Sequence, residues 1–182
     1  SSIKPYNYVT FIDNNKNVGA GSVLYDTQGP IAQYTCTNRA RPESGGNCLF
    51  DFDRRYPGPM TLRYALGGSR NVPAVKAFTS AVPNDTSPGR TNSINKVIST
   101  IDGLMDNPDG YRCFKDDADV TTATKADETQ CFASAGIGDG AYLHLDDHVN
   151  GIASLSRLGK SLPKTYILKV TNASGKTLKE FK

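Results

Sequence analysis

The feature that most constrains the fold is a run of apolar residues at helical spacing in the middle of the chain. Ile94, Val97, Ile98, Ile101 and Leu104 recur at intervals of three and four residues. Side chains with this spacing share one face of an α-helix, so the pattern predicts an amphipathic helix that packs into the core. At 182 residues, the chain is long enough to bury such a core within one domain.

Further helices and strands are predicted around this central helix. Thr61 can cap a short helix over residues 62–66 that stops at Gly67, and Asn71 is placed to cap a helix that ends near Val82. The other predicted elements are an opening helix that runs out at the polar residues 14–17, a strand over 22–25, a helix over 146–158 ended by Gly159, and a hairpin of 166–170 with 177–181. Residues 29–59 and 106–132 show no period and are predicted to be loops.

Composition and charge exclude several classes of protein. A mean hydropathy of -0.45 with 21% charged residues is typical of a soluble globular protein. No run of about 18 apolar residues is present, so the sequence predicts no membrane span. The formal net charge is +3, but residues 106–147 contain three basic and ten acidic residues. Because the basic residues are dispersed and not interleaved with aromatics, we expect no nucleic-acid partner.

The four cysteines fall into two local pairs in loop-like segments. Of the three possible pairings, we favour Cys36 with Cys48 and Cys113 with Cys131. Neither pair has the Cys-x-x-Cys spacing of zinc or redox sites, which favours structural disulfides. Structural disulfides indicate an extracytoplasmic location.

Two polar motifs carry the chemistry. Ser1 and Lys4 are three residues apart, and within a helix this spacing brings a hydroxyl near an amine that can act as its base. Pro5 is compatible with a first helical turn. The triplet Ser69-Arg70-Asn71 follows Gly68 at the joint between two predicted helices. Its serine and asparagine also suit plain turn and cap roles, and we interpret Arg70 as a solvent or groove residue.

These motifs resemble those of the transpeptidase domain of class A, bifunctional penicillin-binding proteins. Residues 1–5 resemble the S-x-x-K-P helix start of that family, and residues 58–76 are similar to its G-P-x-T-L-R-x-A-L-x-x-S-x-N-x-P-A-V run. Residues 22–26 resemble its following strand, and residues 134–138 its short Gly-rich turn. The resemblance covers nearly the whole chain.

The resemblance implies an α+β fold of the penicillin-binding transpeptidase and serine β-lactamase-like type. It implies a bacterial peptidoglycan D,D-transpeptidase, an acyltransferase that cross-links the cell wall and binds penicillin. Ser1 is then the nucleophile toward a D-Ala-D-Ala stem peptide, Lys4 the leading base, Ser69 a proton relay and Asn71 a substrate-amide ligand. Stem peptides are the implied partners, and β-lactam antibiotics the covalent inhibitors.

The sequence departs from the family pattern in one important respect. The Lys-Thr-Gly strand is absent, so we expect residues 1–182 to form one partial domain, the mostly helical portion truncated before that strand and most of the central sheet, and to be inactive alone. Residues 174–178 include Lys176-Thr177 but continue with Leu178, and we interpret them as a decoy. The parent protein is expected to be anchored on the extracytoplasmic side of the membrane and to carry a glycosyltransferase domain.

Other interpretations of the same residues remain open. An N-terminal serine can use its own amine as base, as N-terminal-nucleophile hydrolases do, and a penicillin-sensing or structural module of the same fold would keep the nucleophile without transferring the acyl group. His144 and His148 lack a further ligand at metal-binding spacing. The acids of residues 116–128 lack the glycine and spacing of a calcium loop, which favours a solvated loop. We expect no metal and no cofactor.

Overall fold

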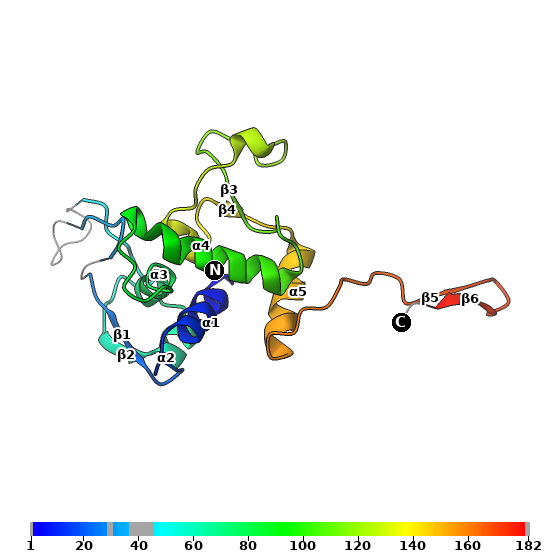
Figure 1. Ribbon diagram of the computed structural model, residues 1–182, viewed down its shortest axis with the longest axis horizontal. Helices are drawn as coiled ribbons and strands as arrows, with labels where there is room; N and C mark the ends of the chain where they lie inside the picture. Colours follow the sequence, from blue (N-terminus) through cyan, green and yellow to red (C-terminus); the bar gives the residue numbers. More distant parts are fainter. Residues whose placement is uncertain (1, 29–30, 37–45, 181–182) are drawn as a thin grey trace.

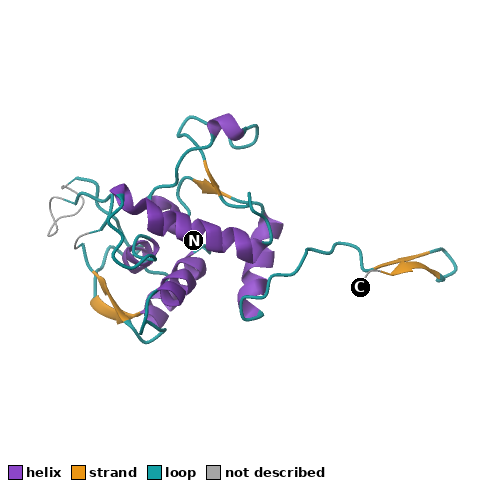
Figure 2. Ribbon diagram, viewed as in Figure 1, coloured by secondary structure: helices purple, strands orange, loops and turns teal. Residues whose placement is uncertain are grey.

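The computed structural model describes residues 2–28, 31–36 and 46–180, and most of their regular structure is helical (Figure 2). The α-helices are α1 (Lys4–Asn14), α2 (Leu62–Gly67), α3 (Asn71–Phe78), α4 (Thr91–Met105) and α5 (Leu145–Ser156). The strands are β1 (Val23–Asp26), β2 (Gly58–Thr61), β3 (Arg112–Cys113), β4 (Ala141–Tyr142), β5 (Lys169–Thr171) and β6 (Thr177–Glu180). Short 3₁₀ helices are η2 (Pro88–Arg90), η3 (Lys125–Asp127) and η4 (Ala133–Ile137).

The core forms where α1 packs against α3 and α4, and α5 packs against the end of α4 and against Tyr6 of α1 (Figure 1). The predicted central helix is confirmed, because α4 buries Ile94, Val97 and Ile101 completely. The aromatic rings of Tyr6 and Phe78 fill the space between these helices. The core therefore fixes α1 and α3, the two helices that carry the predicted site residues.

The strands form three separate antiparallel pairs within the described part of the chain. β1 pairs with β2, β3 with β4, and β5 with β6. The β5–β6 hairpin extends away from the helical body (Figure 1) and is exposed throughout. On α5, Leu145 and Val149 also expose their apolar side chains. No helix in the described ranges is both long and apolar enough to cross a membrane.

Four predicted boundaries differ from the structure. Helix α3 ends at Phe78 rather than near Val82, because the backbone N–H of Val82 donates instead to Ser93 Oγ at 3.2 Å. The predicted loop before Pro59 runs into β2, which pairs with β1. The final hairpin pairs residues 169–171 with 177–180, and the predicted end at Phe181 lies outside the described residues. Helix α5 also ends earlier than predicted, at Ser156, and the left-handed residues after it are Leu158, with a φ of 59°, and Gly159, with a φ of 86°.

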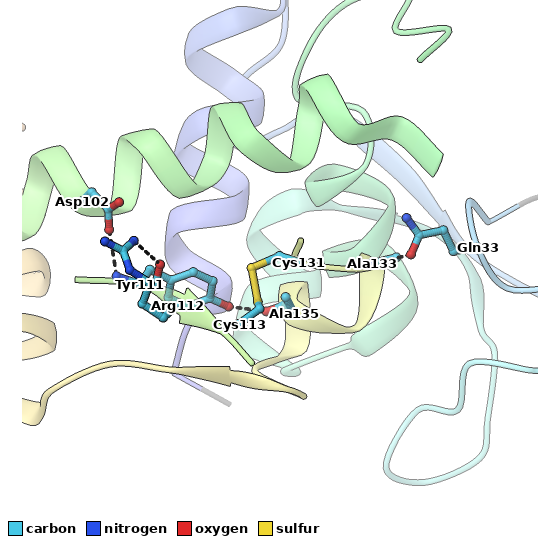
Figure 3. Close-up of a disulfide and its surroundings, with 8 residues drawn as sticks. All are labelled: Gln33, Asp102, Tyr111, Arg112, Cys113, Cys131, Ala133 and Ala135. Atoms are coloured by element: carbon cyan, nitrogen blue, oxygen red, sulfur yellow. Dashed lines mark hydrogen bonds between the residues drawn. A yellow bond between two sulfur atoms is a disulfide. The ribbon is translucent and has the colours of Figure 1, made fainter. Parts of the chain in front are cut away.

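Two disulfides link the predicted cysteine pairs, so that prediction is confirmed. Cys36–Cys48 has a Cα–Cα distance of 4.4 Å and Cys113–Cys131 one of 5.2 Å. Beside the second bridge, the Tyr111 hydroxyl donates to the Ala135 carbonyl at 2.6 Å (Figure 3). Each bridge closes a short loop and contributes about 3 kcal/mol in the chain-entropy model. The acidic loop around η3 is thereby attached to the core.

Gly151 on α5 lets Tyr6 approach the helix backbone. A Cβ atom at this position would overlap the Tyr6 hydroxyl and lie 3.1 Å from Met105 Cγ. Tyr6 is fully buried, so it has no room to move aside. We therefore expect Gly151→Ala to destabilise the fold by about 1–3 kcal/mol through overpacking, measured by thermal unfolding of the full-length protein with circular dichroism.

Gly103 on α4 provides the matched control for this substitution. A Cβ atom there meets nothing within 4 Å, so Gly103→Ala is expected to stabilise the helix by up to about 1 kcal/mol through its better helix propensity. Equal unfolding midpoints for the two variants would contradict the close packing of Tyr6 on α5.

Candidate functional site

Three of the four predicted site residues meet around the Lys4 amine. Lys4 lies in the first turn of α1 and is only 2% exposed. Its Nζ donates to Ser69 Oγ at 3.1 Å and to Asn71 Oδ1 at 2.7 Å, and it also donates to the Ser69 carbonyl oxygen. Ser1, the predicted nucleophile, lies outside the described residues.

The joint between α2 and α3 presents Ser69 to this amine. Thr61 caps α2 as predicted, by accepting from the Tyr64 backbone N–H. Beyond the end of that helix, Ser69 has a φ of 51°, a left-handed conformation that is uncommon for residues other than glycine. The turn directs both the Ser69 hydroxyl and its carbonyl toward Lys4, while the residue itself remains exposed. A solvent-accessible hydroxyl beside a buried amine can exchange a proton with a bound molecule.

Residues 50 and 51 hold Asn71 by its side chain and by its backbone. Its side-chain Nδ2 donates to the Phe50 carbonyl at 2.7 Å, and its backbone N–H donates to Asp51 Oδ1. The prediction that Asn71 caps α3 is wrong, because Asn71 is the first residue of that helix and its side chain faces Lys4 instead. A side-chain amide has two N–H donors and two acceptor lone pairs. Asn71 uses one donor with Phe50 and one lone pair with Lys4, so one of each remains for a substrate amide.

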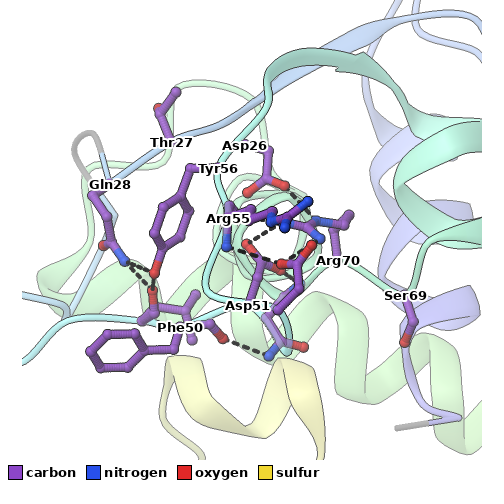
Figure 4. A network of polar contacts seen from close by, with 12 residues as sticks. Asp26, Thr27, Gln28, Phe50, Asp51, Arg55, Tyr56, Ser69 and Arg70 are labelled. Atoms are coloured by element: carbon purple, nitrogen blue, oxygen red, sulfur yellow. Dashed lines mark hydrogen bonds and ion pairs between the residues drawn. The ribbon is translucent and has the colours of Figure 1, made fainter. Parts of the chain in front are cut away.

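Arg70 corrects another prediction, since it is not a solvent or groove residue. Its side chain is 12% exposed and pairs with three acids, of which Figure 4 labels Asp26 and Asp51. Its Nε is 2.6 Å from Asp26 Oδ2 and its Nη1 is 2.9 Å from Asp53 Oδ1. Its Nη2 is 3.5 Å from Asp51 Oδ2. The acids at 51 and 53, spaced two apart in a loop, were the only sequence signal for this cluster.

Burial shifts the pKa values of Lys4 and Asp26. It lowers the pKa of the Lys4 amine below its usual range, and among charged neighbours Asp51 raises this pKa while Arg70 lowers it. Burial and the neighbouring Asp51 carboxyl also raise the pKa of Asp26 to about 7. A lysine with a lowered pKa is more often neutral at physiological pH, which a general base requires.

His148 takes part in hydrogen bonds to α1 and to the turn that precedes it. Its Nε2 is 2.9 Å from Ser2 Oγ, and its Nδ1 is 3.2 Å from the Tyr6 hydroxyl. The preceding acids Asp146 and Asp147 both accept from Lys164. Within the described residues, no group of three or more His, Cys, Asp or Glu side chains is arranged to hold a metal ion.

Residues 174–178, which share Lys-Thr with the Lys-Thr-Gly motif, lie far from Lys4. Residues 174–176 form the turn of the exposed β5–β6 hairpin, where Asn172 Oδ1 accepts from the backbone N–H groups of Ser174 and Lys176. Figure 1 shows this hairpin at the end of the chain, away from α1 and α3. Its Lys-Thr pair therefore makes no contact with the predicted site.

The described structure is mostly helical with a few short strands, which confirms the predicted mixture of helix and strand, and its fold matches part of a solved penicillin-binding protein. The chain is similar to the crystal structure of penicillin-binding protein 1A from Haemophilus influenzae, with a TM-score of 0.62 and 19% sequence identity. That similarity covers 100% of this chain and 21% of the solved chain.

A curated protein also matches in sequence. Penicillin-binding protein 1A/1B of Bacillus subtilis (strain 168) is 49% identical over 51 residues, which are 28% of this chain and 6% of that protein. No family model matches the chain. Together, the sequence and structural matches confirm the predicted resemblance to class A penicillin-binding proteins, of whose length this chain spans about a fifth or less.

Proposed function

We propose that residues 1–182 are one partial transpeptidase domain of a cell-wall D,D-transpeptidase that acts through an acyl-serine intermediate. The observation that carries this proposal is the convergence of Ser69 and Asn71 on the buried Lys4 amine, across more than 60 residues of sequence. Ser1 precedes Lys4, the first residue of α1, by three residues, a spacing that can bring a serine nucleophile within reach of a lysine base. The relatives' shared name, penicillin-binding protein, agrees with this chemistry.

Each residue then has a defined role. Neutral Lys4 accepts the Ser1 hydroxyl proton as Ser1 Oγ forms a bond to the carbonyl carbon of the penultimate D-Ala. The bond to the terminal D-Ala nitrogen breaks, and Ser69 passes a proton to that leaving amine. Asn71 holds the amide of the stem peptide. An amine of a second peptide strand then attacks the ester, releases Ser1 and completes the cross-link.

The substrate also fixes where the protein acts. Peptidoglycan strands are cross-linked outside the cytoplasm, and the two disulfides suit an oxidising compartment. We extend the proposal to a longer protein on the extracytoplasmic side of the bacterial membrane, with a membrane anchor and a glycosyltransferase domain. β-Lactams acylate the same serine in this scheme.

A labelling experiment tests the proposal. The full-length protein is expected to form a denaturation-resistant adduct with a fluorescent penicillin, and peptide mapping should locate the added mass on Ser1. Release of D-alanine from a stem peptide should accompany it. An adduct without D-alanine release would identify a penicillin-sensing module instead, and an adduct on another residue would refute Ser1 as the nucleophile.

A further inference from the structure

Arg70 lies between two acids that are almost completely buried. Asp26 is 0% and Asp51 2% exposed, and the Arg70 guanidinium is within ion-pair distance of both. Placing charges in the interior costs several kcal/mol per ion unless they are closely paired. Because this cost is large and the cluster lies directly beside Ser69 and Asn71, we look for its role in the placement of those two residues.

The cluster reaches the site through Asp51. Its Oδ1 accepts the backbone N–H of Asn71, while its Oδ2 faces Arg70. The neighbouring Phe50 carbonyl accepts from the Asn71 side chain. Asn71 is thus held by residues 50 and 51 on one side and contacts Lys4 on the other.

The segment that carries Asp51 is itself anchored. Cys48 is bridged to Cys36, and Leu49 is 4% exposed in a cluster with Val72 and Val75 of α3. The Leu49 carbonyl accepts from the Tyr56 hydroxyl at 3.2 Å. The position of Asp51 relative to α3 is therefore determined by covalent and apolar contacts, and not by the ion pairs alone.

We infer that Arg70, Asp26 and Asp51 form a positioning cluster that places Asn71, and through it the Lys4 amine, for acyl transfer. This inference rests on the proposed function. None of the three acts on substrate directly; they hold the groups that do. Misplacing a catalytic group by about 1 Å can cost as much as 10²-fold in rate.

The cluster also acts on the charge of Lys4. Burial lowers the pKa of the amine, the Asp51 carboxylate raises it and the Arg70 guanidinium lowers it further. The other titratable side chains around the cluster are Asp26 and Asp53, which pair with Arg70, and Tyr8, Tyr56 and Lys76, which interact electrostatically with Asp26. Removing Arg70 should therefore raise the pKa of Lys4, whereas neutralising Asp51 should lower it.

Opposite shifts of the pH profile test the inference in the full-length protein. Arg70→Gln is expected to slow penicillin acylation about tenfold to a hundredfold at pH 7, and to move the acid limb of the rate profile to higher pH. Asp51→Asn keeps an oxygen for the Asn71 N–H and should move that limb to lower pH. A general loss of folding cannot produce shifts of opposite sign.

Arg63→Gln is the matched control, because Arg63 is exposed on α2 and makes no ion pair with a described residue. Equal rates and pH profiles for the Arg63 and Arg70 variants, or shifts of the same sign at 51 and 70, would overturn the inference. Titration of the Lys4 amine by NMR in the same variants, with ¹⁵N-labelled lysine, should show the same opposite shifts. That readout needs no acylation, so it separates failure of the inference from failure of the proposed function.

Discussion

Replacing Ser1 with alanine in the full-length protein is expected to abolish covalent labelling by penicillin. Alanine has no hydroxyl, so no ester can form, whatever the state of the neighbouring amine. The loss should be complete and not merely a slower rate, because the adduct itself requires the Ser1 oxygen. A denaturing gel with a fluorescent penicillin measures it directly.

Ser2→Ala is the control for this result. Ser2 follows Ser1 in sequence, but its hydroxyl lies 2.9 Å from His148 Nε2. Among the described residues, the hydrogen-bond partners of the Lys4 amine are Ser69 and Asn71. The Ser2 variant is expected to keep the covalent label. Labelling of the Ser1 variant at the wild-type level, or its loss only in the Ser2 variant, would falsify the assignment of the nucleophile.

The helices were predictable where the pattern is long. Five apolar residues at helical spacing placed α4 correctly, since its packing face is encoded in residues that are neighbours in sequence. The end of α3 was not predictable. It depends on Ser93, eleven residues further along the chain, whose hydroxyl oxygen accepts a hydrogen bond from the Val82 backbone N–H.

The short strands escaped prediction for a related reason. β3 and β4 each have two residues, too few to display an alternating period. They pair Arg112 with Tyr142 across thirty positions, beside the disulfide of Cys113. Such pairing follows from how the loop is closed, and a local pattern does not encode it.

The same distinction between local patterns and contacts of distant segments applies to the candidate site. Lys4, Ser69 and Asn71 were identified from two motifs, and the structure brings them into one hydrogen-bonded group. Arg70 was misread, because its partners Asp26 and Asp51 are 44 and 19 positions before it. Ion pairs between distant segments leave no periodic trace, and an arginine between two polar residues resembles any exposed arginine.

The contacts of Lys4 explain why its motif alone is weak evidence. Many helices begin with a serine and carry a lysine three residues later, and such a lysine ordinarily reaches solvent. Here the amine is turned inward, and its hydrogen-bond acceptors come from the joint before α3. The acceptors keep the amine oriented, and burial without a directly bonded carboxylate favours its neutral form.

Lys4→Met is therefore expected to slow penicillin acylation by about 10²- to 10⁴-fold, the usual contribution of a general base. Methionine preserves much of the apolar stem but cannot accept the Ser1 proton. Stopped-flow or quenched-gel measurement of the acylation rate checks this expectation. A slow adduct should still form on Ser1, which distinguishes this variant from Ser1→Ala.

Two further variants separate the base from a purely structural role of Lys4. Lys4→Arg keeps the positive charge and hydrogen-bond donors, yet a guanidinium does not lose its proton in proteins, so its acylation rate should fall about as far as that of Lys4→Met. Lys96→Met, at an exposed position on α4, should react at the wild-type rate. Full recovery of the rate in Lys4→Arg would show that the charge of Lys4 matters and its basicity does not, because only a neutral amine can take the proton from Ser1.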